Sequence, residues 1–219
     1  MRLGVVDADK PVADALVAVL NACGHEAAPV GSGAELLTSH RDYDVVILDL
    51  NLPDMDGEHA LRRFRMVSSA PVVVLTVNND ERTVVRALRL GADDYLVKPA
   101  PVGVLIARLE NISRRRVSPT VLAPVMVVTR DVCVDLAARE VRVGGEPVAL
   151  TPSEFRVVEI LVEKPGSAVS RQQLRDRIWG DAFLALSRSL DVHVSTLRAK
   201  LNRPGLINTV RGYGYRWEV

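Results

Sequence analysis

The sequence predicts two domains, a doubly wound α/β domain with a five-stranded parallel sheet followed by a smaller α+β domain. In the first half, apolar strand-like segments alternate with helical segments, an order typical of a parallel sheet covered by helices on both faces. In the second half, short strand-like segments surround three helical segments. Residues 1–112 carry 11 Lys and Arg against 16 Asp and Glu, and residues 113–219 carry 17 against 11. The basic second half therefore predicts a polyanionic partner.

The strands of the first domain are short apolar segments bounded by polar residues. Those at 44–48 and 71–75 are continuous apolar runs, as expected for strands buried on both faces. Between the strands, apolar residues recur at helical spacing. We expect strands at 3–6, 27–30, 44–48, 71–75 and 95–97, and helices at 12–23, 34–39, 57–66, 80–90 and 102–112.

Four polar side chains follow these strands, and they have complementary chemistry. Asp7, Asp49, Thr76 and Lys98 each lie at or just after a strand end, and the carboxyl ends of parallel strands meet at one edge of a sheet. A carboxylate can accept a phosphoryl group, while a hydroxyl and an ammonium group bind its oxygens. The set predicts a phosphoryl site. A metal-dependent phosphotransfer enzyme is a remote alternative, and a nucleotide site is disfavoured because no glycine-rich loop follows the first strand.

Three motifs in this half carry a family resemblance: VILDLNLPDMDG, the pair Leu75–Thr76, and GADDYLVKP. Residues 2–112 resemble the receiver domain of two-component response regulators, which has a flavodoxin-like fold. The resemblance implies that Asp49 is the phosphoacceptor, with Asp7, Thr76 and Lys98 around the phosphoryl group. It also implies that Asp7, Asp49 and the backbone carbonyl of Asn51 bind Mg²⁺, that Tyr95 is an aromatic switch, and that the Lys98–Pro99 peptide is cis.

The stretch LGVVDADK departs from the receiver pattern at the first strand end. Receivers usually carry two adjacent acids there, the second of which ligates Mg²⁺, and Ala8 occupies that second position. We expect Asp9, one residue later, to serve the turn or the N-terminus of the next helix. A methyl group cannot ligate Mg²⁺. We therefore expect weak or absent Mg²⁺ binding and phosphorylation, and a pocket in which Lys98 pairs directly with Asp49.

A second departure affects the face through which DNA-binding members of the family dimerise. Asp94 and Arg108 keep one of its charged pairs. Val84 and Val104 stand where relatives often have a basic and an acidic partner. Arg89 and Glu110 stand where relatives have an acid and a base, so the two charges are exchanged in this chain. We expect a dimer face with altered chemistry, in which an apolar contact avoids salt screening and ion desolvation.

The second half predicts two capped helices and a third helix with two distinct faces. Strands are expected at 125–129, 132–135, 140–143 and 147–150, and capping boxes begin at Thr151 and Ser170. The third helix, 189–201, places Leu190, Val194, Leu197 and Leu201 on one buried stripe. Its opposite face carries Val192, Ser195, Thr196 and Ala199, flanked by His193, Arg198 and Lys200.

The C-terminus predicts a β-hairpin over 207–219 with Arg211 at its tip. Residues 125–219 resemble the winged-helix effector domain of OmpR/PhoB-type regulators. Two motifs carry this resemblance: SLDVHVSTLRAKL and NTVRGYGYRW. A helix with small residues approaches base edges closely, and a hairpin arginine can enter a minor groove. The expected DNA-binding residues are Arg188, Val192, His193, Ser195, Thr196, Arg198, Lys200 and Arg211.

We therefore expect a receiver over residues 1–112, a linker over 113–124 and a DNA-binding domain over 125–219. The expected function is a cytoplasmic, sequence-specific transcriptional regulator, not an enzyme, controlled by constitutive dimerisation or a ligand. A conventional regulator, activated by histidine-kinase phosphorylation of Asp49 with Mg²⁺, is the alternative. Expected partners are double-stranded DNA with tandem half-sites, a second copy through the receiver, and RNA polymerase.

Two further expectations concern thiols and membranes. Cys23 and Cys133 lie far apart and fit no metal-ligand spacing, so we expect reduced, buried thiols. No apolar run approaches the ~20 residues of a membrane span, and no export signal is evident at the N-terminus. We therefore expect no membrane association.

Overall fold

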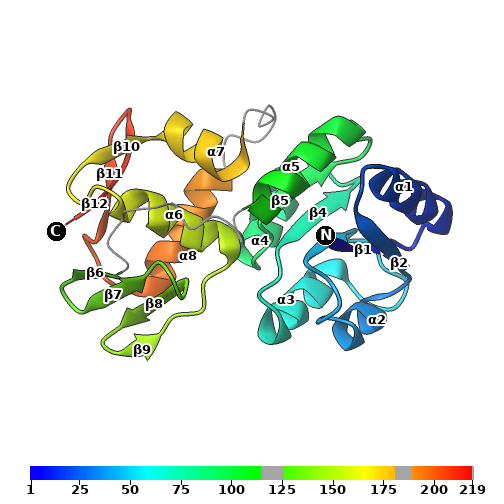
Figure 1. Cartoon of the computed structure of the whole chain (residues 1–219), viewed down its shortest axis with the longest axis horizontal. Helices are drawn as coiled ribbons and strands as arrows, with labels where there is room; N and C mark the ends of the chain where they lie inside the picture. The colour runs from blue at the N-terminus through cyan, green and yellow to red at the C-terminus, as the bar shows by residue number, and fades with distance from the viewer. Residues whose placement is uncertain (115–125, 181–188, 219) are drawn as a thin grey trace. The chain divides into compact units, whose positions relative to one another are not determined.

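The first unit, Met1–Ser113, is built around a five-stranded parallel sheet in the order β2-β1-β3-β4-β5 (Figure 1). The structure is a computed structural model that describes residues 1–114, 126–180 and 189–218. The predicted doubly wound fold of this half is confirmed. Its strands are β1 Arg2–Val6, β2 Glu26–Val30, β3 Val45–Leu48, β4 Val72–Thr76 and β5 Asp94–Val97, and its helices are α1 Lys10–Ala22, α2 Gly33–Thr38, α3 Gly57–Val67, α4 Glu81–Arg89 and α5 Val102–Arg114.

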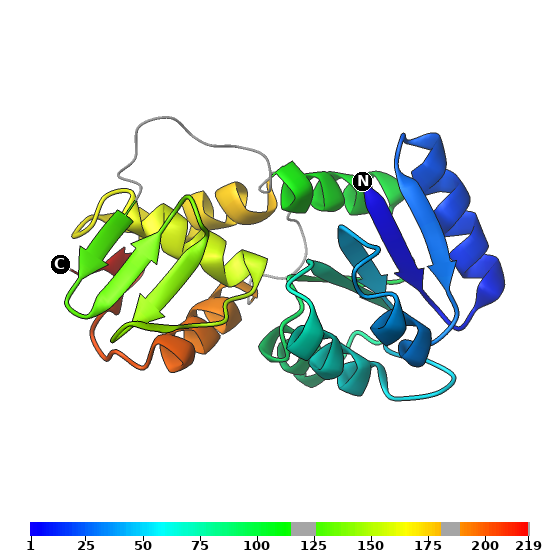
Figure 2. The ribbon, with the colours of Figure 1, turned by 60° about the horizontal axis from the view of Figure 1, so that its bottom comes forward.

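The sheet of this unit is covered on both faces. Helices α1 and α5 lie on one face and α2 and α3 on the other (Figure 2). Strands β3 and β4 are buried along their whole length, which explains why their sequences are continuously apolar instead of alternating. Because β1 lies between β2 and β3, the carboxyl ends of β1 and β3 are neighbours.

Polar caps fix where the helices of this unit begin. Asp9 is the N-cap of α1, and its carboxylate accepts a hydrogen bond from the backbone N–H of Val12 at 3.2 Å. The expectation that Asp9 serves the next helix is therefore confirmed. Ser32, Asp56 and Asp80 cap α2, α3 and α4 in the same way. The cis Lys98–Pro99 peptide is present as well.

In the second unit, Arg114–Val219, the described residues form two antiparallel sheets and three helices. Strands β6, β7, β8 and β9 form one sheet, and β10, β12 and β11 form the other in that order. Its strands are β6 Met126–Thr129, β7 Val132–Asp135, β8 Glu140–Val143, β9 Glu146–Pro147, β10 Ala168–Ser170, β11 Ile207–Val210 and β12 Gly214–Trp217, and its helices are α6 Pro152–Val162, α7 Arg171–Trp179 and α8 Ser189–Leu201.

Most of the elements predicted in this half are present. Both capping boxes form, at Thr151 with Glu154 and at Ser170 with Gln173. The strand expected at 147–150 is present as β9, but its bounds are wrong: it begins at Glu146 and ends at Pro147, before the chain enters the cap of α6. Strand β10 was not expected. It has only three residues and ends at Ser170, the cap of α7, so its sequence is too short to show an alternating pattern. Its partner β12 lies far away in the sequence. The expected linker lies almost entirely outside the described residues.

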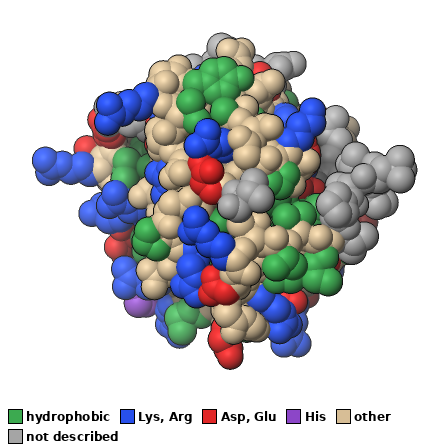
Figure 3. Space-filling model, turned by 90° about the vertical axis from the view of Figure 1, so that its left-hand side faces the viewer, with side chains coloured by type: hydrophobic (Ala, Val, Ile, Leu, Met, Phe, Trp, Pro, Cys, Tyr) green, Lys and Arg blue, Asp and Glu red, His purple; other side chains and the backbone are tan. Residues whose placement is uncertain are grey.

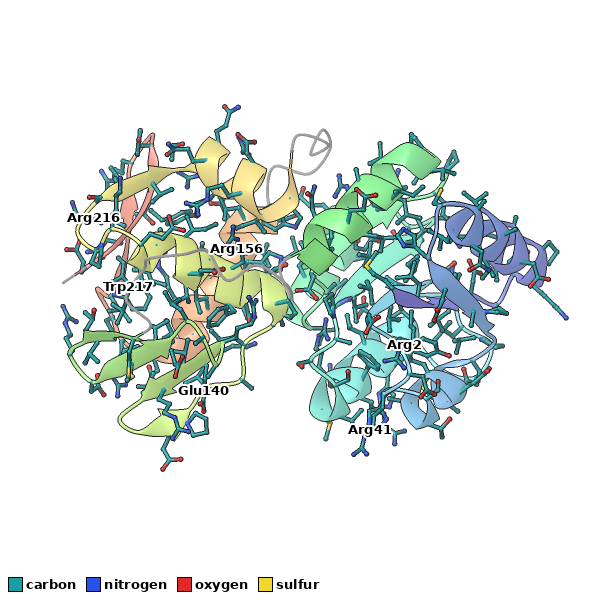
Figure 4. All side chains as sticks on the ribbon, viewed as in Figure 1. Arg2, Arg41, Glu140, Arg156, Arg216 and Trp217 are labelled. Carbon is teal, nitrogen blue, oxygen red and sulfur yellow. The ribbon has the colours of Figure 1, made fainter. Side chains whose placement is uncertain are left out.

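The core of the second unit joins its two sheets to its helices. The predicted α8 stripe is confirmed, because Leu190, Val194, Leu197 and Leu201 are all buried. Trp217 of β12 points inward, and its indole Nε1 donates to Thr129 Oγ1 of β6 at 3.0 Å (Figure 4). This hydrogen bond connects the C-terminal hairpin to the first sheet of the unit.

The expectations about thiols and membranes have different outcomes. Cys23 and Cys133 are free, but Cys23 is exposed at the C-cap of α1 and Cys133 is only half-buried, so the expected burial is wrong. The helices of the described residues include none long and apolar enough to cross a membrane.

Gly57 lets α3 begin against the loop that follows β3. A Cβ at this position would lie 2.6 Å from the carbonyl oxygen of Leu50, which accepts the Gly57 N–H at 3.0 Å. We expect Gly57→Ala to lower the free energy of unfolding of the first unit by about 2 kcal/mol, since backbone must move. Gly103→Ala in α5 is the control; its Cβ would meet nothing within 4 Å, so it should stabilise by up to about 1 kcal/mol.

Urea unfolding followed by circular dichroism measures both variants. Trp179 and Trp217 are the two tryptophans of the chain and both lie in the second unit, so their fluorescence reports that unit separately. Equal unfolding of the two glycine variants would contradict the role assigned to Gly57.

Candidate functional site

Four strand ends of the first unit bring their polar side chains to one place. Lys98 Nζ donates to Asp7 Oδ2 at 2.6 Å and to Asp49 Oδ2 at 2.5 Å. Backbone hydrogen bonds continue the sheet to these residues: Asp49 N donates to Val6 O at 2.8 Å, and Lys98 N donates to Thr76 O at 2.8 Å. The structure therefore brings the predicted phosphoryl-pocket residues together at the carboxyl edge of the sheet.

The second oxygen of each carboxylate is held by the backbone that follows it. Asp7 Oδ1 accepts from Asp9 N at 2.9 Å, and Asp49 Oδ1 accepts from Asn51 N at 3.1 Å. Both carboxylates are more than nine-tenths buried. Thr76 is fully buried, and its hydroxyl oxygen has no hydrogen-bond partner in the described part of the chain. The structure thus joins two oriented carboxylates to one ammonium group, and leaves the Thr76 hydroxyl at the end of β4 without a partner in the described residues.

The ammonium group of Lys98 is held in its charged form. Burial alone would lower its pKa, but the hydrogen bonds to Asp49 and Asp7 outweigh burial, and the pKa of Lys98 is raised above its ordinary value of 10.5. Only 17% of its side chain is exposed. One fixed positive charge therefore lies between two negative ones.

The pocket is a poor fit for Mg²⁺, the cofactor that receiver domains generally use. Ala8 presents a methyl group at the position of the usual second acid, and the carboxylate of Asp9 is engaged as a helix cap. Lys98 already contacts an oxygen of both remaining carboxylates. Among the residues described, the structure contains no cluster of three or more His, Cys, Asp or Glu side chains that could hold a metal ion. Mg²⁺ usually keeps several waters and binds proteins through one or two carboxylates, and this pocket offers only those of Asp7 and Asp49, both already engaged by Lys98.

Tyr95, the predicted switch, is fully buried and tied to the loop after β4. Its hydroxyl donates to the carbonyl oxygen of Asn78 at 2.7 Å. Burial first, and then the negative charge of Asp49, raise the pKa of Tyr95 to about 12, so the hydroxyl keeps its proton. Asn78 Oδ1 accepts from Asp80 N at 2.8 Å at the cap of α4.

The same loop is connected to helices α3 and α4. The carboxylate of Asp80 accepts from Thr83 N at 2.9 Å and from the Thr83 hydroxyl at 3.1 Å. Arg86 of α4 donates to Glu58 of α3 at 2.6 Å. A chain of hydrogen bonds therefore connects the switch residue to both helices.

The predicted dimer face contains a pair that is satisfied within one chain. Arg108 and Asp94 form an ion pair at 2.5 Å, with both side chains at most 2% exposed. Val84 is 5% exposed, and Val104 packs partly against the core. A contact between two copies of the chain through this face stays a prediction. Arg89 and Glu110 are exposed.

The predicted DNA-binding face of α8 is only partly exposed. Ser195 is exposed and Thr196 is half-buried, with its hydroxyl donating to Val192 O at 3.1 Å. Val192 is 9% exposed and His193 is 1% exposed, with its ring stacked on Trp179 at 5.6 Å between centroids. Side chains this deeply buried do not fit contacts with DNA bases. The sequence predicted one buried and one exposed face for α8, but residues outside the predicted buried stripe are buried as well.

Two of the predicted DNA-binding cations are engaged inside the unit. Arg198 donates from Nε to Ile207 O at 2.8 Å and from Nη2 to Thr209 Oγ1 at 2.9 Å, which joins α8 to β11. Lys200 pairs with Glu154, a carboxylate that is 1% exposed, at 2.6 Å. Their described contacts make them structural in the free protein.

The remaining predicted cations differ in what the structure describes. Arg211 is exposed in the turn between β11 and β12, as predicted. Arg188 lies outside the described residues. Figure 3 shows that on the face it displays, Lys and Arg side chains lie in separate groups with hydrophobic side chains exposed between them.

A cluster of three polar side chains beside α8 was not predicted from the sequence. Tyr215 of β12, Arg171 at the start of α7 and Asp191 in the first turn of α8 are joined by hydrogen bonds. No sequence pattern could have found it, because its members are 20 to 44 residues apart.

Comparison with known proteins matches both units. Residues 3–110 match the family described as response regulator receiver domain, and residues 145–217 match the family described as transcriptional regulatory protein, C terminal. The DNA-binding response regulator MtrA of Mycobacterium tuberculosis is 38% identical over 221 residues, covering 98% of this chain and 96% of MtrA. The transcriptional regulatory protein AfsQ1 of Streptomyces coelicolor is 38% identical over 218 residues, covering 97% of this chain and 96% of AfsQ1.

Solved structures agree with this assignment. DrrB, an OmpR/PhoB homolog of Thermotoga maritima, has a TM-score of 0.53 at 27% identity, covering all of this chain and 99% of DrrB. A mutant of RitR has a TM-score of 0.82 at 25% identity, covering 99% of this chain and 98% of RitR. With a receiver domain, a C-terminal DNA-binding domain and relatives matched over nearly their whole length, this chain belongs to the OmpR/PhoB-type response regulators, which are transcription regulators and not enzymes.

Proposed function

We propose that this DNA-binding transcription regulator works with little or no dependence on Mg²⁺ and on phosphorylation of Asp49. The observation that carries the proposal is the Lys98 ammonium group, which contacts Asp7 at 2.6 Å and Asp49 at 2.5 Å in a pocket where Ala8 offers no ligand. The repulsion between two carboxylates is reduced by an ammonium group of the chain itself. A divalent cation would have to displace this ammonium group and would gain one carboxylate fewer than usual.

Control in this scheme comes from constitutive dimerisation or from a ligand. The buried Tyr95 hydroxyl and the hydrogen bonds from Asn78 to Asp80 support this, since the loop after β4 is held without a phosphoryl group. Arg89 and Glu110 are the exposed candidates for the dimer face. Two effector domains on one dimer would occupy tandem half-sites about one helical turn apart.

The proposal also assigns the domain ranges, the residues that contact DNA and the place where the protein acts. The residue ranges 1–112, 113–124 and 125–219 are proposed as receiver, linker and effector. Arg211, Ser195 and Thr196 are proposed DNA contacts, and Arg188 is proposed from the resemblance alone. A regulator of this class acts on chromosomal DNA in the cytoplasm and meets RNA polymerase there.

A conventional regulator, phosphorylated at Asp49 by a histidine kinase, is the second candidate. Histidine kinases are the typical partners of this family. The buried Thr76 hydroxyl at the end of β4, which has no partner among the described residues, favours this candidate, because a phosphoryl group could accept its hydrogen bond. The two candidates differ in whether a phosphodonor changes the affinity for DNA.

A phosphodonor experiment separates the two candidates. The full chain, Asp49→Ala and Ala8→Asp are each titrated onto a duplex selected from a random library by the full chain, with and without acetyl phosphate and Mg²⁺. We expect the full chain and Asp49→Ala to keep their affinities. Ala8→Asp should gain about tenfold, or about 1.4 kcal/mol, since it restores the missing carboxylate.

Fluorescence anisotropy measures the affinity, and sedimentation velocity measures dimerisation in the same samples. A gain of tenfold or more by the unsubstituted chain that Asp49→Ala does not share would overturn phosphate independence. It would establish the conventional candidate.

Removing the Lys98 ammonium group should destabilise the receiver in a pH-dependent way. Lys98→Met leaves two buried carboxylates without a neighbouring cation, and we expect the free energy of unfolding to fall by about 3 kcal/mol at neutral pH. The pKa of Lys98 is raised above 10.5 on folding, so its contribution is complete below that pH and disappears as pH rises through the folded value. The difference between the variant and the unsubstituted chain should therefore shrink above about pH 10.5.

Urea unfolding of the receiver, followed by circular dichroism across this pH range, measures the difference. Lys10→Met, at an exposed position on α1, is the matched control and should change little at any pH. If the loss of unfolding free energy in Lys98→Met stays constant well above pH 10.5, the Lys98 ammonium group does not stabilise the receiver through its charge.

Arg211 should contribute to DNA binding from the hairpin turn. Arg211→Ala is expected to weaken binding to the selected duplex about tenfold, or about 1.4 kcal/mol, and to reduce the slope of log affinity against log salt by about one. Arg41→Ala removes the same charge from the receiver and is the control (Figure 4). Equal effects of the two substitutions would exclude a contact by Arg211.

A further inference from the structure

One face of α8 is exposed within the second unit, and it begins with an acid. Asp191, Ser195 and Ala199 are exposed at i, i+4 and i+8, opposite the buried stripe that contains Leu190 and Val194. Ser195 and Ala199 are small, so this face can approach a surface closely. Asp191 lies in the first turn of the helix, where recognition helices place residues that contact base edges.

The carboxylate of Asp191 is held in one orientation by two donors. Its Oδ1 accepts from the Tyr215 hydroxyl and from Arg171 Nη2, the latter at 3.1 Å. Arg171 also donates to the Tyr215 hydroxyl at 3.3 Å, and its guanidinium lies 5.0 Å from the centre of the Tyr215 ring. Burial, followed by the hydrogen bond to Asp191, raises the pKa of Tyr215 to about 12, so this donor keeps its proton.

The second oxygen of the same carboxylate is available. Within the described residues, Asp191 Oδ2 has no hydrogen-bond partner, and 47% of the side chain is exposed. The hydrogen bonds from Arg171 and Tyr215 both go to Oδ1. A fixed carboxylate therefore presents one free acceptor on the exposed face of α8.

The negative charge of Asp191 is offset where it would meet DNA phosphates. An unpaired carboxylate on a DNA-facing helix would be repelled by the backbone. Here Arg171 pairs with Asp191, and Arg198 lies 5.5 Å from the centre of the same Tyr215 ring. Two guanidinium groups against one carboxylate leave this cluster with a net positive charge, which permits close approach.

We propose that Asp191 determines sequence specificity, its free oxygen accepting a hydrogen bond from the N4 amino group of cytosine in the major groove. The proposal rests on DNA binding by the exposed face of α8. Cytosine offers this amino group as its one hydrogen-bonding group in the major groove. Adenine offers a similar amino group, but its neighbouring N7 is an acceptor and would be repelled by a carboxylate. Tyr215 and Arg171 act as positioning residues.

A selection experiment tests the assignment. The full chain, Asp191→Asn and Asp176→Asn each select bound duplexes from a random-sequence library, and affinities are then measured for all four base pairs at each selected position. Asp176 is an exposed acid on α7 and controls for the change in charge. We expect one position in each half-site at which the full chain and Asp176→Asn prefer cytosine by tenfold or more. Asp191→Asn should lose that preference and keep the others.

Tyr215→Phe separates positioning from folding. It keeps the ring between the two guanidinium groups but removes the hydroxyl that orients Asp191, so the cytosine preference should weaken at the same position alone. Thermal unfolding confirms that each variant is folded. An unchanged base preference in folded Asp191→Asn overturns the inference, and so does a preference for adenine at that position or a uniform loss at all positions. A full chain that selects no sequence would instead refute sequence-specific DNA binding itself.

Discussion

The Lys98 ammonium group is the interaction on which the receiver pocket of this chain depends. It lies between the carboxylates of Asp7 and Asp49, which come from two neighbouring strands, and its own backbone N–H donates to the end of a third. Because the three groups are buried, separating the charges from one another would leave uncompensated ions in a low-dielectric site. The pairing therefore holds the carboxyl ends of β1, β3 and β4 together. In a pocket that lacks the usual second acid, the chain supplies the cation itself.

The loop after β4 is held by hydrogen bonds from the chain itself. Tyr95 is buried against the loop after β4, and Asn78 connects that loop to the cap of α4. Each hydrogen bond in such a network contributes modestly by itself. Together they hold the loop between Thr76 and Asp80 in place. This loop joins the end of β4 at the pocket to the start of α4.

Regular patterns made the architecture predictable, while the contacts of single side chains were not. The continuous apolar runs of β3 and β4, and the cap at Asp9, follow from local sequence and were predicted correctly. The convergence of Asp7, Asp49 and Lys98 followed from one topological rule about strand ends. The roles expected of His193 and Arg108 came from family positions, which do not indicate that both side chains are buried in this chain. The Asp191–Tyr215 contact joins residues far apart in sequence, which periodicity cannot register.

The engagement of Lys200 by Glu154 changes how alanine scanning of α8 is interpreted. Glu154 also closes the capping box of α6, with its Oε2 accepting the Thr151 N–H at 2.8 Å and the Lys200 ammonium at 2.6 Å. Truncating Lys200 would leave a buried acid unpaired and loosen the start of a core helix. Weaker DNA binding would follow without the loss of a single phosphate contact. A scan scored only by affinity would therefore count a scaffold residue as part of the DNA interface, whereas scoring affinity and melting temperature together would separate the two classes.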